Sequence, residues 1–407
     1  MEVIITRVED ALDHPRAFGR FCLVGLAVHL SYALSRFPVL PLYARSLGLS
    51  NGMIGLVVAA STITGIFLKL PAGRMSDLLG RRPLLILSAC LFAFPPFLYP
   101  LAGAGLALML LRFIHGAATG TFGPVSSAIV VDVAEPARRG ERLSTFSSAT
   151  LVGKSLGPLI GGYLIVGTDF HWPFLASGVA GVAALGVALT WTRETRATVA
   201  AGSFGVAEFF HGVREVARQF GVMATSVVEG VQFLATGALD AFLPIYASEV
   251  VGLSGHQIGW LVAGQIVTTL LAKPILGRFS DRTGRRPQIV AGLLIGALAL
   301  GLIRTAHGFT ALILLSALYG AGVAVTTSAT AALVTDLVRS DRYGTAHGVF
   351  GTIMDVGHAA GPITAGLLAD QLGVARGLGL IGIFLACSAV GFAVLPAFTP
   401  QRPVLRG

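Results

Sequence analysis

Residues 73–83 read Gly-Arg-Met-Ser-Asp-Leu-Leu-Gly-Arg-Arg-Pro. The stretch returns at residues 277–287 as Gly-Arg-Phe-Ser-Asp-Arg-Thr-Gly-Arg-Arg-Pro, at an offset of 204 positions. The same offset relates further pairs on both sides: Lys69 and Lys273, Gly116 and Gly320, Asp132 and Asp336, and Gly157-Pro158 and Gly361-Pro362. One offset kept over so much of the chain indicates two parallel copies of one structural unit, an arrangement typical of membrane transporters.

The composition places these repeats in a membrane. Of the 407 residues, 54% are hydrophobic and 12% are charged, and the mean hydropathy is +0.79, whereas soluble domains carry about 25% charged residues. A helix needs about 20 apolar residues to span a bilayer. Apolar segments of that order recur at 20–44, 52–72, 83–101, 105–131, 143–167, 172–192, 222–247, 257–277, 287–306, 309–337, 345–368 and 375–397. We therefore predict an all-α membrane protein with twelve transmembrane helices in two pseudo-symmetric six-helix bundles, because no alternating barrel pattern is present.

The polar break between the sixth and seventh segments divides the chain. We expect an N-terminal six-helix bundle over 1–192, a cytoplasmic linker over 193–221 and a C-terminal six-helix bundle over 222–407. Within the linker, the stretch from Phe204 to Phe220 mixes aromatic and aliphatic residues with charged ones, which predicts a short amphipathic helix on the inner membrane surface.

The distribution of the 29 Lys and Arg residues predicts the orientation. With the N-terminus inside, most of them fall on cytoplasmic loops, tails or helix ends, as the positive-inside rule requires. The net charge of +9 then needs no nucleic acid as a partner. Acidic residues such as Glu2, Glu9 and Asp10 are atypical of a cleaved signal peptide. We expect a multi-pass protein of the plasma (inner) membrane with both termini in the cytoplasm.

On these motifs the chain resembles the major facilitator superfamily over essentially its whole length, and in particular the twelve-helix drug-proton antiporters. The family loop after the second helix matches Gly73, Asp77, Gly80, Arg81 and Arg82, with a departure at Leu78. Its second copy matches Gly277, Asp281, Gly284 and Arg285. An Arg in the fourth helix before a glycine face matches Arg112, Gly116 and Gly120. The exporter motif of the fifth helix matches Gly153, Gly157, Pro158, Gly161 and Gly162, although Ser144 replaces its first glycine.

The first of these motifs is a candidate gate. Gly73 and Gly80 permit a tight turn, and Asp77 can accept from backbone N–H groups at a neighbouring helix start. Arg81 and Arg82 suit the inner headgroups. The resemblance implies that the loop locks the two halves together on the cytoplasmic side; a merely topogenic turn is the alternative.

The fifth-helix motif predicts close helix packing. Gly153, Gly157 and Gly161 lie four apart and share one helix face, and the repeat carries Gly361. Pro158 and Pro362 each remove a backbone hydrogen bond, so we expect a bend at both. Simple packing without a transport role is the alternative.

Charged residues inside membrane segments are costly and therefore functional candidates. The first half carries Arg36, Arg112 and Lys154, and the second carries Glu229, Asp240 and Asp355. Pairs across a central cavity are expected, Arg36 with Asp240 among them. A fixed ion pair without a gating role is the alternative.

Proton coupling is assigned to the acids of the second half. Asp355 and His358 are three residues apart on one helix face and are the candidate proton relay, with Asp240, Glu229 and Arg112 as further members. A locally satisfied polar pair is the alternative. The resemblance implies an acid in the first helix, where this chain has Arg36 instead, so a purely cationic substrate fits less well. The expected substrate cavity contains Arg36, Arg112, Lys154, Tyr32, Gln232, Asp240, Gln265 and Tyr319.

Several activities lack their motifs. The chain has no phosphate-binding loop, no His-Glu-x-x-His and no Gly-x-Ser-x-Gly sequence. Its three cysteines lie far apart, so we expect no metal, no cofactor and no enzyme. The predicted partners are a small-molecule substrate, protons and the lipid bilayer, with the protein as a monomer.

The sequence thus predicts a secondary active transporter that works by alternating access, with proton-coupled efflux of a small organic molecule or drug. A proton-coupled symporter or uniporter for uptake of a sugar or organic acid is the first alternative. A non-transporting membrane receptor or scaffold is the second.

Overall fold

The computed structural model describes residues 15–135, 138–191, 194–195, 213–339, 342–396 and 398, and nearly all of them are helical. Ten helical segments in these ranges are long and apolar enough to cross a membrane. Helices α8 (Arg139–Tyr163) and α15 (Tyr343–Leu372), with 25 and 30 residues, are also long enough but carry more polar side chains. The predicted helical membrane fold is confirmed, and these two helices fit the predicted count of twelve.

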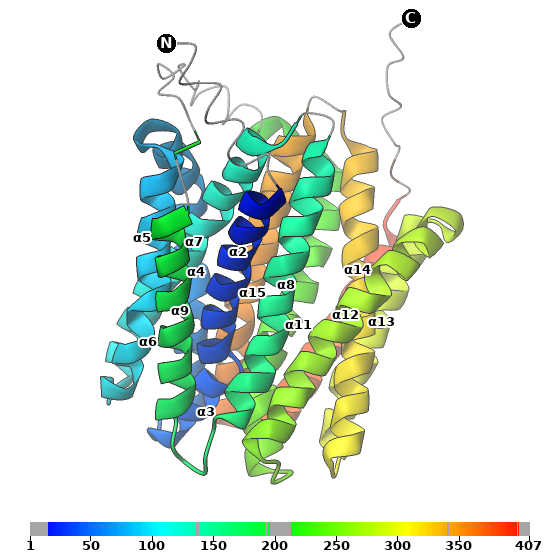
Figure 1. The fold of residues 1–407 in the computed structure, drawn as a ribbon. Helices are drawn as coiled ribbons and strands as arrows, with labels where there is room; N and C mark the ends of the chain where they lie inside the picture. Colours follow the sequence, from blue (N-terminus) through cyan, green and yellow to red (C-terminus); the bar gives the residue numbers. More distant parts are fainter. Residues whose placement is uncertain are drawn as a thin grey trace, which may run out of the picture. The chain divides into compact units, whose positions relative to one another are not determined.

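The chain divides into two compact units. Unit 1 comprises Met1–Leu49 and Ala60–Gly202, and unit 2 comprises Ser50–Ala59 and Ser203–Gly407. The helices of unit 1 are α2 (Pro15–Arg36), α3 (Val39–Ser46), most of α4 (Asn51–Leu79), α5 (Arg81–Ala93), α6 (Pro95–Leu98), η1 (Tyr99–Leu101), α7 (Gly105–Val133), α8 and α9 (His171–Trp191) (Figure 1). The predicted spans 20–44 and 83–101 are each interrupted near a proline, at Pro38 and Pro95, because proline has no N–H for the helix ladder.

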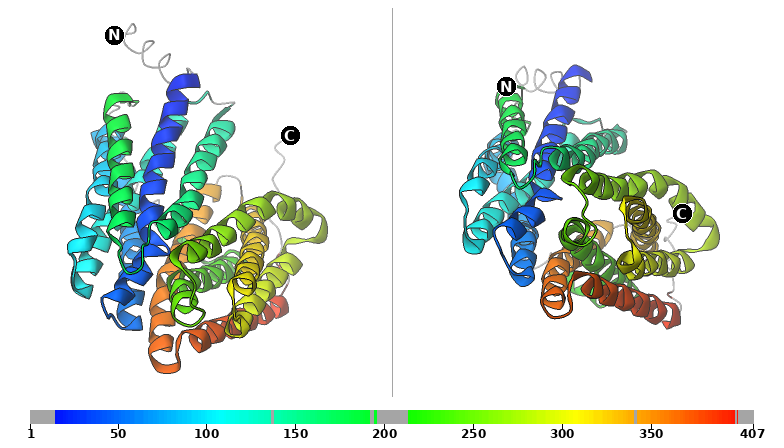
Figure 2. Two further views of the ribbon diagram at one scale, coloured as in Figure 1. Left: turned by 60° about the horizontal axis from the view of Figure 1, so that its bottom comes forward. Right: turned by 90° about the horizontal axis from the view of Figure 1, so that it is seen from below.

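Unit 2 repeats this order. Its helices are α11 (Phe220–Glu249), α12 (Gly255–Thr283), α13 (Arg285–Leu302), η3 (Ile303–Thr305), α14 (Phe309–Leu337), α15 and α16 (Val374–Val394). Helix α11 packs on α15 as α2 packs on α8 in unit 1. In unit 2, α14 contacts both α12 and α13, and α13 contacts α16, as the views of Figure 2 allow the reader to follow.

Glycines bring equivalent helices into backbone contact in both units. A Cβ on Gly153 of α8 would collide with the carbonyl oxygen of Leu26 in α2. A Cβ on Gly357 of α15 would collide with the carbonyl oxygen of Gly230 in α11, 204 positions further along on both helices. Close packing along the predicted glycine faces is therefore present, and the repeat seen in the sequence is a repeat of contacts.

The turns after α4 and α12 depend on one glycine each. Gly80 and Gly284 have φ values of 96° and 92°, a region that L-residues with a Cβ rarely adopt. The expectation that Gly73 shares in the turn is wrong, because α4 stays helical up to Leu79. Gly277 likewise lies within α12.

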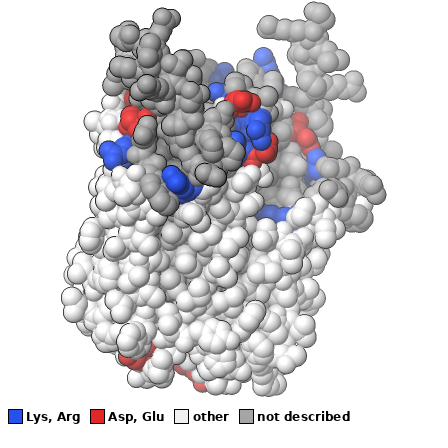
Figure 3. Space-filling model, viewed as in Figure 1, with Lys and Arg blue, Asp and Glu red and all other residues white. Residues whose placement is uncertain are grey.

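One face of the molecule has its charged side chains toward the ends of the helices (Figure 3). On the face drawn in Figure 3, Lys and Arg lie toward the upper end, and a broad band below them shows neither basic nor acidic residues. This band is what a multi-pass membrane protein requires.

The predicted amphipathic helix falls partly outside the described residues, which exclude 204–212. Residues 213–217 are helical, and Val216 is buried. Glu215 pairs with Arg342 at the start of α15 at 2.9 Å. Placement of this segment on the membrane surface stays a prediction.

Candidate functional site

A buried polar network in unit 1 is centred on Arg112 of α7, whose side chain has no exposed surface. Its Nη2 donates to the hydroxyl oxygen of Tyr32 in α2 at 3.2 Å and to that of Ser61 in α4. The Tyr32 hydroxyl donates to Ser61 at 3.0 Å. The guanidinium carbon also lies 5.4 Å from the centre of the Tyr32 ring, within the range of a cation–π contact. Two predicted cavity residues thus share one network across three helices.

His115 extends this network by one turn of α7. Its ring meets the ring of Tyr32 edge-on at 5.0 Å, and its Nδ1 lies 3.0 Å from the hydroxyl of Tyr99. Among the described residues, three buried nitrogens of this pair have no hydrogen-bond partner: Nε and Nη1 of Arg112 and Nε2 of His115. Buried polar groups without partners are rare in proteins. The two Arg112 nitrogens are always donors, so the network lacks acceptors for them.

Two more predicted cavity cations lie near the network. The Arg36 guanidinium is 5.4 Å from the centre of the Tyr32 ring and 4.7 Å from that of Phe37. Lys154, exposed in the middle of α8, interacts electrostatically with Arg36 and with Lys69 of α4. The structure therefore brings Arg36, Arg112 and Lys154 into one region of unit 1.

Unit 2 has a neutral network in the corresponding region. The hydroxyl of Tyr319 in α14 accepts from Nε2 of Gln232 at 3.2 Å and lies 2.9 Å from the hydroxyl of Thr236, all three residues being buried. Gln265 of α12 is also buried and presents its backbone to Gly320. These predicted cavity residues are part of the helix packing of their unit.

The two networks are related by the repeat. Gly116 lies against the backbone of Ser61, and Gly320 lies against the backbone of Gln265, so the offset of 204 holds in space for α4 and α7 against α12 and α14. By this offset Arg112 corresponds to Ser316 and His115 to Tyr319. One repeat therefore has a cation where the other has a serine.

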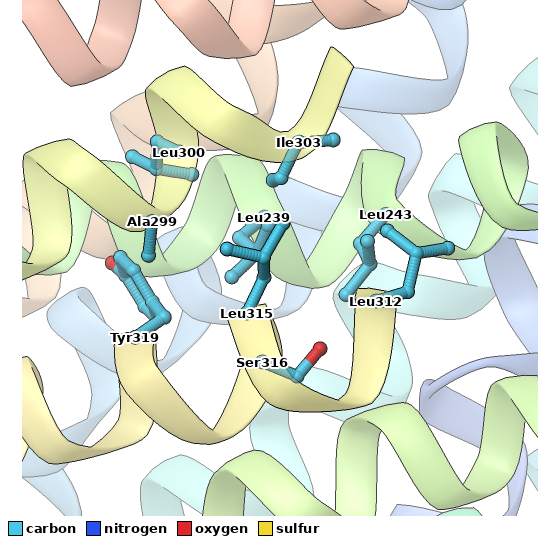
Figure 4. A pocket seen from close by; sticks show the side chains of 9 residues that line it. All are labelled: Leu239, Leu243, Ala299, Leu300, Ile303, Leu312, Leu315, Ser316 and Tyr319. Atoms are coloured by element: carbon cyan, nitrogen blue, oxygen red, sulfur yellow. The ribbon is translucent and has the colours of Figure 1, made fainter. Parts of the chain in front are cut away.

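Ser316 borders a small pocket of unit 2 (Figure 4). Its volume is about 10 Å³, and its lining is otherwise mainly leucine, with Leu239, Leu243, Leu300, Leu312 and Leu315. A space of this size holds at most one water molecule, so it is not a substrate site.

Glu229 is the most buried predicted proton-coupling acid, with 2% of its surface exposed. Its Oε2 accepts from the hydroxyl of Thr330 in α14 at 2.7 Å, and Lys273 of α12 interacts with it electrostatically. Within the described part of the chain, Glu229 has no ion pair closer than 4 Å. The carboxyl group of Glu229 thus lies among α11, α12 and α14, and its hydrogen-bond donor among the described residues is the neutral hydroxyl of Thr330.

The other predicted proton-coupling residues of unit 2 are half-buried. Asp355 and His358 lie one turn apart on α15, and the His358 ring is 6.0 Å from that of Phe233. Asp240 lies in the C-terminal third of α11 and interacts electrostatically with Tyr319. The structure keeps all of them within one unit, and the relay stays a prediction.

An ionic cluster holds the α4–α5 turn in unit 1. The Arg81 side chain, 10% exposed, pairs with Asp77 at 2.7 Å and with Asp132 of α7 at 3.0 Å, and it donates to Ser76 at 2.6 Å. In unit 2, Arg285 pairs with Asp336 at 3.2 Å, while the side chain of Asp281 lies outside the described residues. Asp132 pairs with Arg81 and Asp336 pairs with Arg285. In the sequence, only the common offset of the two aspartates indicated this role.

Two carboxylate groups cap the starts of helices, and the sequence predicted neither of them. Glu194 accepts from the backbone N–H groups of Arg81 at 2.8 Å and Arg82 at 3.0 Å, so the amides that open α5 bind Glu194. Asp370 of α15 accepts from the backbone N–H groups of Asn51 at 2.9 Å and Gly52 at 2.8 Å, at the start of α4. Neither acid has an acidic counterpart at the repeat offset, so no pattern in the sequence marks them.

Comparison with models of protein families identifies the family of this chain. The model of the Major Facilitator Superfamily matches residues 21–228 and 225–406. The chain belongs to this superfamily. Among its relatives, an uncharacterized MFS-type transporter of Methanocaldococcus jannaschii is 23% identical over 347 residues, which cover 83% of this chain and 88% of that protein. The quinolone resistance protein NorA of Staphylococcus aureus is 24% identical over 355 residues, covering 86% of this chain and 90% of that protein.

Solved structures support the same fold. A bacterial homolog of the human lysosomal transporter Spinster, in an inward-facing and unoccupied conformation, has a TM-score of 0.79 at 16% identity, covering 93% of this chain and 95% of that one. The resemblance to the superfamily predicted from the loop motifs is thus confirmed. This MFS transporter is a multi-pass membrane protein, and within its described residues no group of three or more His, Cys, Asp or Glu side chains is placed to hold a metal ion.

Proposed function

We propose that this MFS transporter is a secondary active exporter that couples proton entry to the efflux of a small organic molecule by alternating access. It would act as a monomer in the plasma (inner) membrane, with both termini in the cytoplasm. The two repeats of helices support a rocking mechanism of the kind typical of such transporters. The relationship to a quinolone resistance protein supports efflux as the direction.

The observation that carries the coupling proposal is the carboxyl group of Glu229. Intramembrane acids are costly and mark proton relays, and burial in an apolar surrounding favours the protonated form of a carboxyl group. A group that is buried in one conformation and reaches water in another therefore carries a proton across. Thr330 supports this role, since its hydroxyl lies 2.7 Å from Oε2 of Glu229 and can donate to the carboxylate or accept from the protonated acid.

Asp240, Asp355 and His358 are proposed as the further groups of the proton path, because among the described side chains they are the half-buried Asp, Glu and His residues of the membrane helices of unit 2. Arg112 of unit 1 is proposed as the cationic member of this set. Protonation and substrate binding would oppose each other, so each promotes release of the other.

Exporter packing is proposed for the glycine motif of α8. A Cβ on Gly157 would lie 2.8 Å from the carbonyl carbon of Ala33 and 2.9 Å from the nitrogen of Leu34 in α2, and Gly361 repeats this contact between α15 and α11. Small residues of this kind let the backbones of two helices approach closely, so that each helix pair can move as one body. The α4–α5 and α12–α13 turns are proposed as the gate, with Asp77, Arg81 and Arg285 at the helix ends that flank them.

Proton movement tests the function directly. Inside-out membrane vesicles with an acidic interior would receive norfloxacin, D-xylose or benzoate while a pH-sensitive dye reports the interior. An exporter releases interior protons when its substrate is added. Glu229→Gln should abolish this release while Glu249→Gln, at the exposed end of the same helix α11, should keep it.

Two outcomes would overturn the proposal. Proton release that persists in Glu229→Gln would remove Glu229 from the coupling path. No release with any compound, combined with uptake of labelled solute into right-side-out vesicles, would replace the exporter by the symporter or uniporter for a sugar or organic acid.

A further inference from the structure

The membrane helices of unit 1 carry charge of one sign only in their interiors. Lys69, Arg112 and Lys154 lie within α4, α7 and α8, and Arg36, the last residue of α2, lies inside the membrane span Phe18–Ser46. The acids of these helices, Asp77, Asp132 and Glu141, all fall within the first or last three residues of their helix. Like charges in a low-dielectric interior repel one another strongly, so the interior of this unit attracts an anion.

The guanidinium of Arg112 is not a requirement of the fold. The repeat places Ser316 at the equivalent position of unit 2, where the same glycine contact between neighbouring helices is kept. Since one copy of the unit packs with a neutral residue there, the cation in the other copy adds a property that packing does not need.

The network around Arg112 also has unused hydrogen-bonding capacity. Nε and Nη1 of Arg112 and Nε2 of His115 are buried without partners among the described residues, and both side chains lie against the ring of Tyr32. When the Tyr99 hydroxyl donates to Nδ1 of His115, Nε2 carries the ring hydrogen, and all three nitrogens are then donors. A cluster of buried donors with a net positive charge is complementary to a carboxylate.

We propose that the cluster of Tyr32, Arg112 and His115 in unit 1 binds a carboxylate of the transported molecule, so that this protein exports organic anions or zwitterions. The assignment rests on the proposed transport function and adds the substrate class to it. Charge-assisted hydrogen bonds from guanidinium to carboxylate are the strong ones, and they supply the acceptors that the buried nitrogens lack.

Lys154 and Arg36 extend the same positive region toward the surface of unit 1. Lys154 is exposed although it lies in the middle of α8, and Arg36 is half-buried. A surface lined by one sign of charge with apolar walls concentrates the opposite ion and raises its rate of arrival. These two cations therefore attract the anion, and Arg112 with His115 holds it.

Binding to the purified full-length protein tests this proposal without any proton gradient. Benzoate, benzamide and benzamidine have one shape and carry a negative charge, no charge and a positive charge. We expect benzoate to raise the melting temperature in a concentration-dependent manner, while the other two do not. Because a hydrogen bond to a charged group contributes about 1.5–3 kcal/mol, Arg112→Gln should weaken benzoate about 10-fold to 100-fold.

Controls separate a binding role from a structural one. Arg304→Gln, an exposed arginine of unit 2, should keep the affinity for benzoate. The melting temperature of Arg112→Gln without ligand should not fall below that of the parent protein, because an uncompensated buried charge has been removed. If Arg112→Gln does not fold, Lys154→Gln and Arg112→Lys are measured instead. We expect Lys154→Gln to lower the affinity for benzoate severalfold and Arg112→Lys to lower it by less.

Three results would overturn the assignment. A melting temperature that benzoate leaves unchanged excludes a carboxylate site. Equal binding of benzoate by Arg112→Gln and the parent protein places the site elsewhere. Sodium chloride that matches the effect of benzoate at equal ionic strength identifies an inorganic anion site in place of a substrate site. All three are independent of proton release, so failure here differs from failure of the exporter proposal.

Discussion

The contact between α15 and α11 offers the sharpest test of the packing argument. Gly361 faces α11, and a Cβ added there would lie 2.8 Å from the nitrogen of Ala238 and closer still to the carbonyl oxygen of Leu234. Both neighbours are backbone atoms, which cannot rotate away as a flexible side chain can. Gly351 lies in the same helix, and a Cβ added there meets nothing within 4 Å. The pair Gly361→Ala and Gly351→Ala therefore differs in the contact alone.

The magnitude follows from two opposing effects. Replacing glycine by alanine inside a helix stabilises it by about 0.5–1 kcal/mol. At Gly361 the helices must also part by roughly half an ångström or more, and overpacking of this kind costs about 1–3 kcal/mol. We expect Gly351→Ala to be neutral or slightly stabilising and Gly361→Ala to be less stable by about 1–2 kcal/mol.

Thermal unfolding of the purified protein in one detergent measures the difference. For a unit of this size, 1 kcal/mol corresponds to about 2–4 °C in melting temperature, so Gly361→Ala should melt several degrees below Gly351→Ala. If the two variants melt together, the α11–α15 contact is looser than the structure shows, and the packing interpretation of the glycine motif fails.

Three further expectations concern the polar contacts at the helix ends. Glu194→Gln should lower stability by about 0.5–2 kcal/mol, as loss of a helix cap does, and unchanged thermal unfolding would contradict the capping role. Arg81→Gln should lower the free energy of unfolding by about 1–3 kcal/mol, because a side chain that is 10% exposed loses two acidic partners. Arg285→Gln should lower it by less than about 1 kcal/mol, because the Arg285 side chain is 23% exposed. The reverse order would refute the argument from burial. The backbone N–H and ring of His171 bond to Asp169 and lower the pKa of that carboxyl group below 3.8. This stabilisation is present above that pH and lost as the pH falls through the lowered pKa, so Asp169→Asn should reduce the melting temperature at pH 6 and approach the parent protein as the solution is acidified below about pH 4.

The repeat and the membrane fold were readable from the sequence. Hydropathy identifies a membrane span from a single segment, because lipid imposes the same requirement on every residue of that segment. The offset of 204 was visible in the loop motifs and then recurs in space, as the contacts of Gly153 and Gly357 with the helices they face demonstrate. Interruptions of the spans at Pro38 and Pro95 were also encoded locally, although the segments were expected to be continuous.

The partners of individual side chains were not readable in the same way. Glu194 lies 113 positions from the Arg81 amide that it caps, and no local pattern connects the two. The loop motif predicts a turn at Gly73, whereas helix α4 continues to Leu79. The sequence identified Arg112 as a buried charge, but its contacts with Tyr32 and Ser61 depend on how α2, α4 and α7 face one another.

Sequence alone determined that this chain is a repeated, helical, membrane-embedded transporter, since periodicity, hydropathy and family motifs are properties of the chain order. Only the tertiary structure decided which polar groups meet and which are left without a partner. That distinction is physical: a helix satisfies its backbone within its own segment, whereas a buried guanidinium or carboxyl group is satisfied by residues that the packing of other helices brings to it.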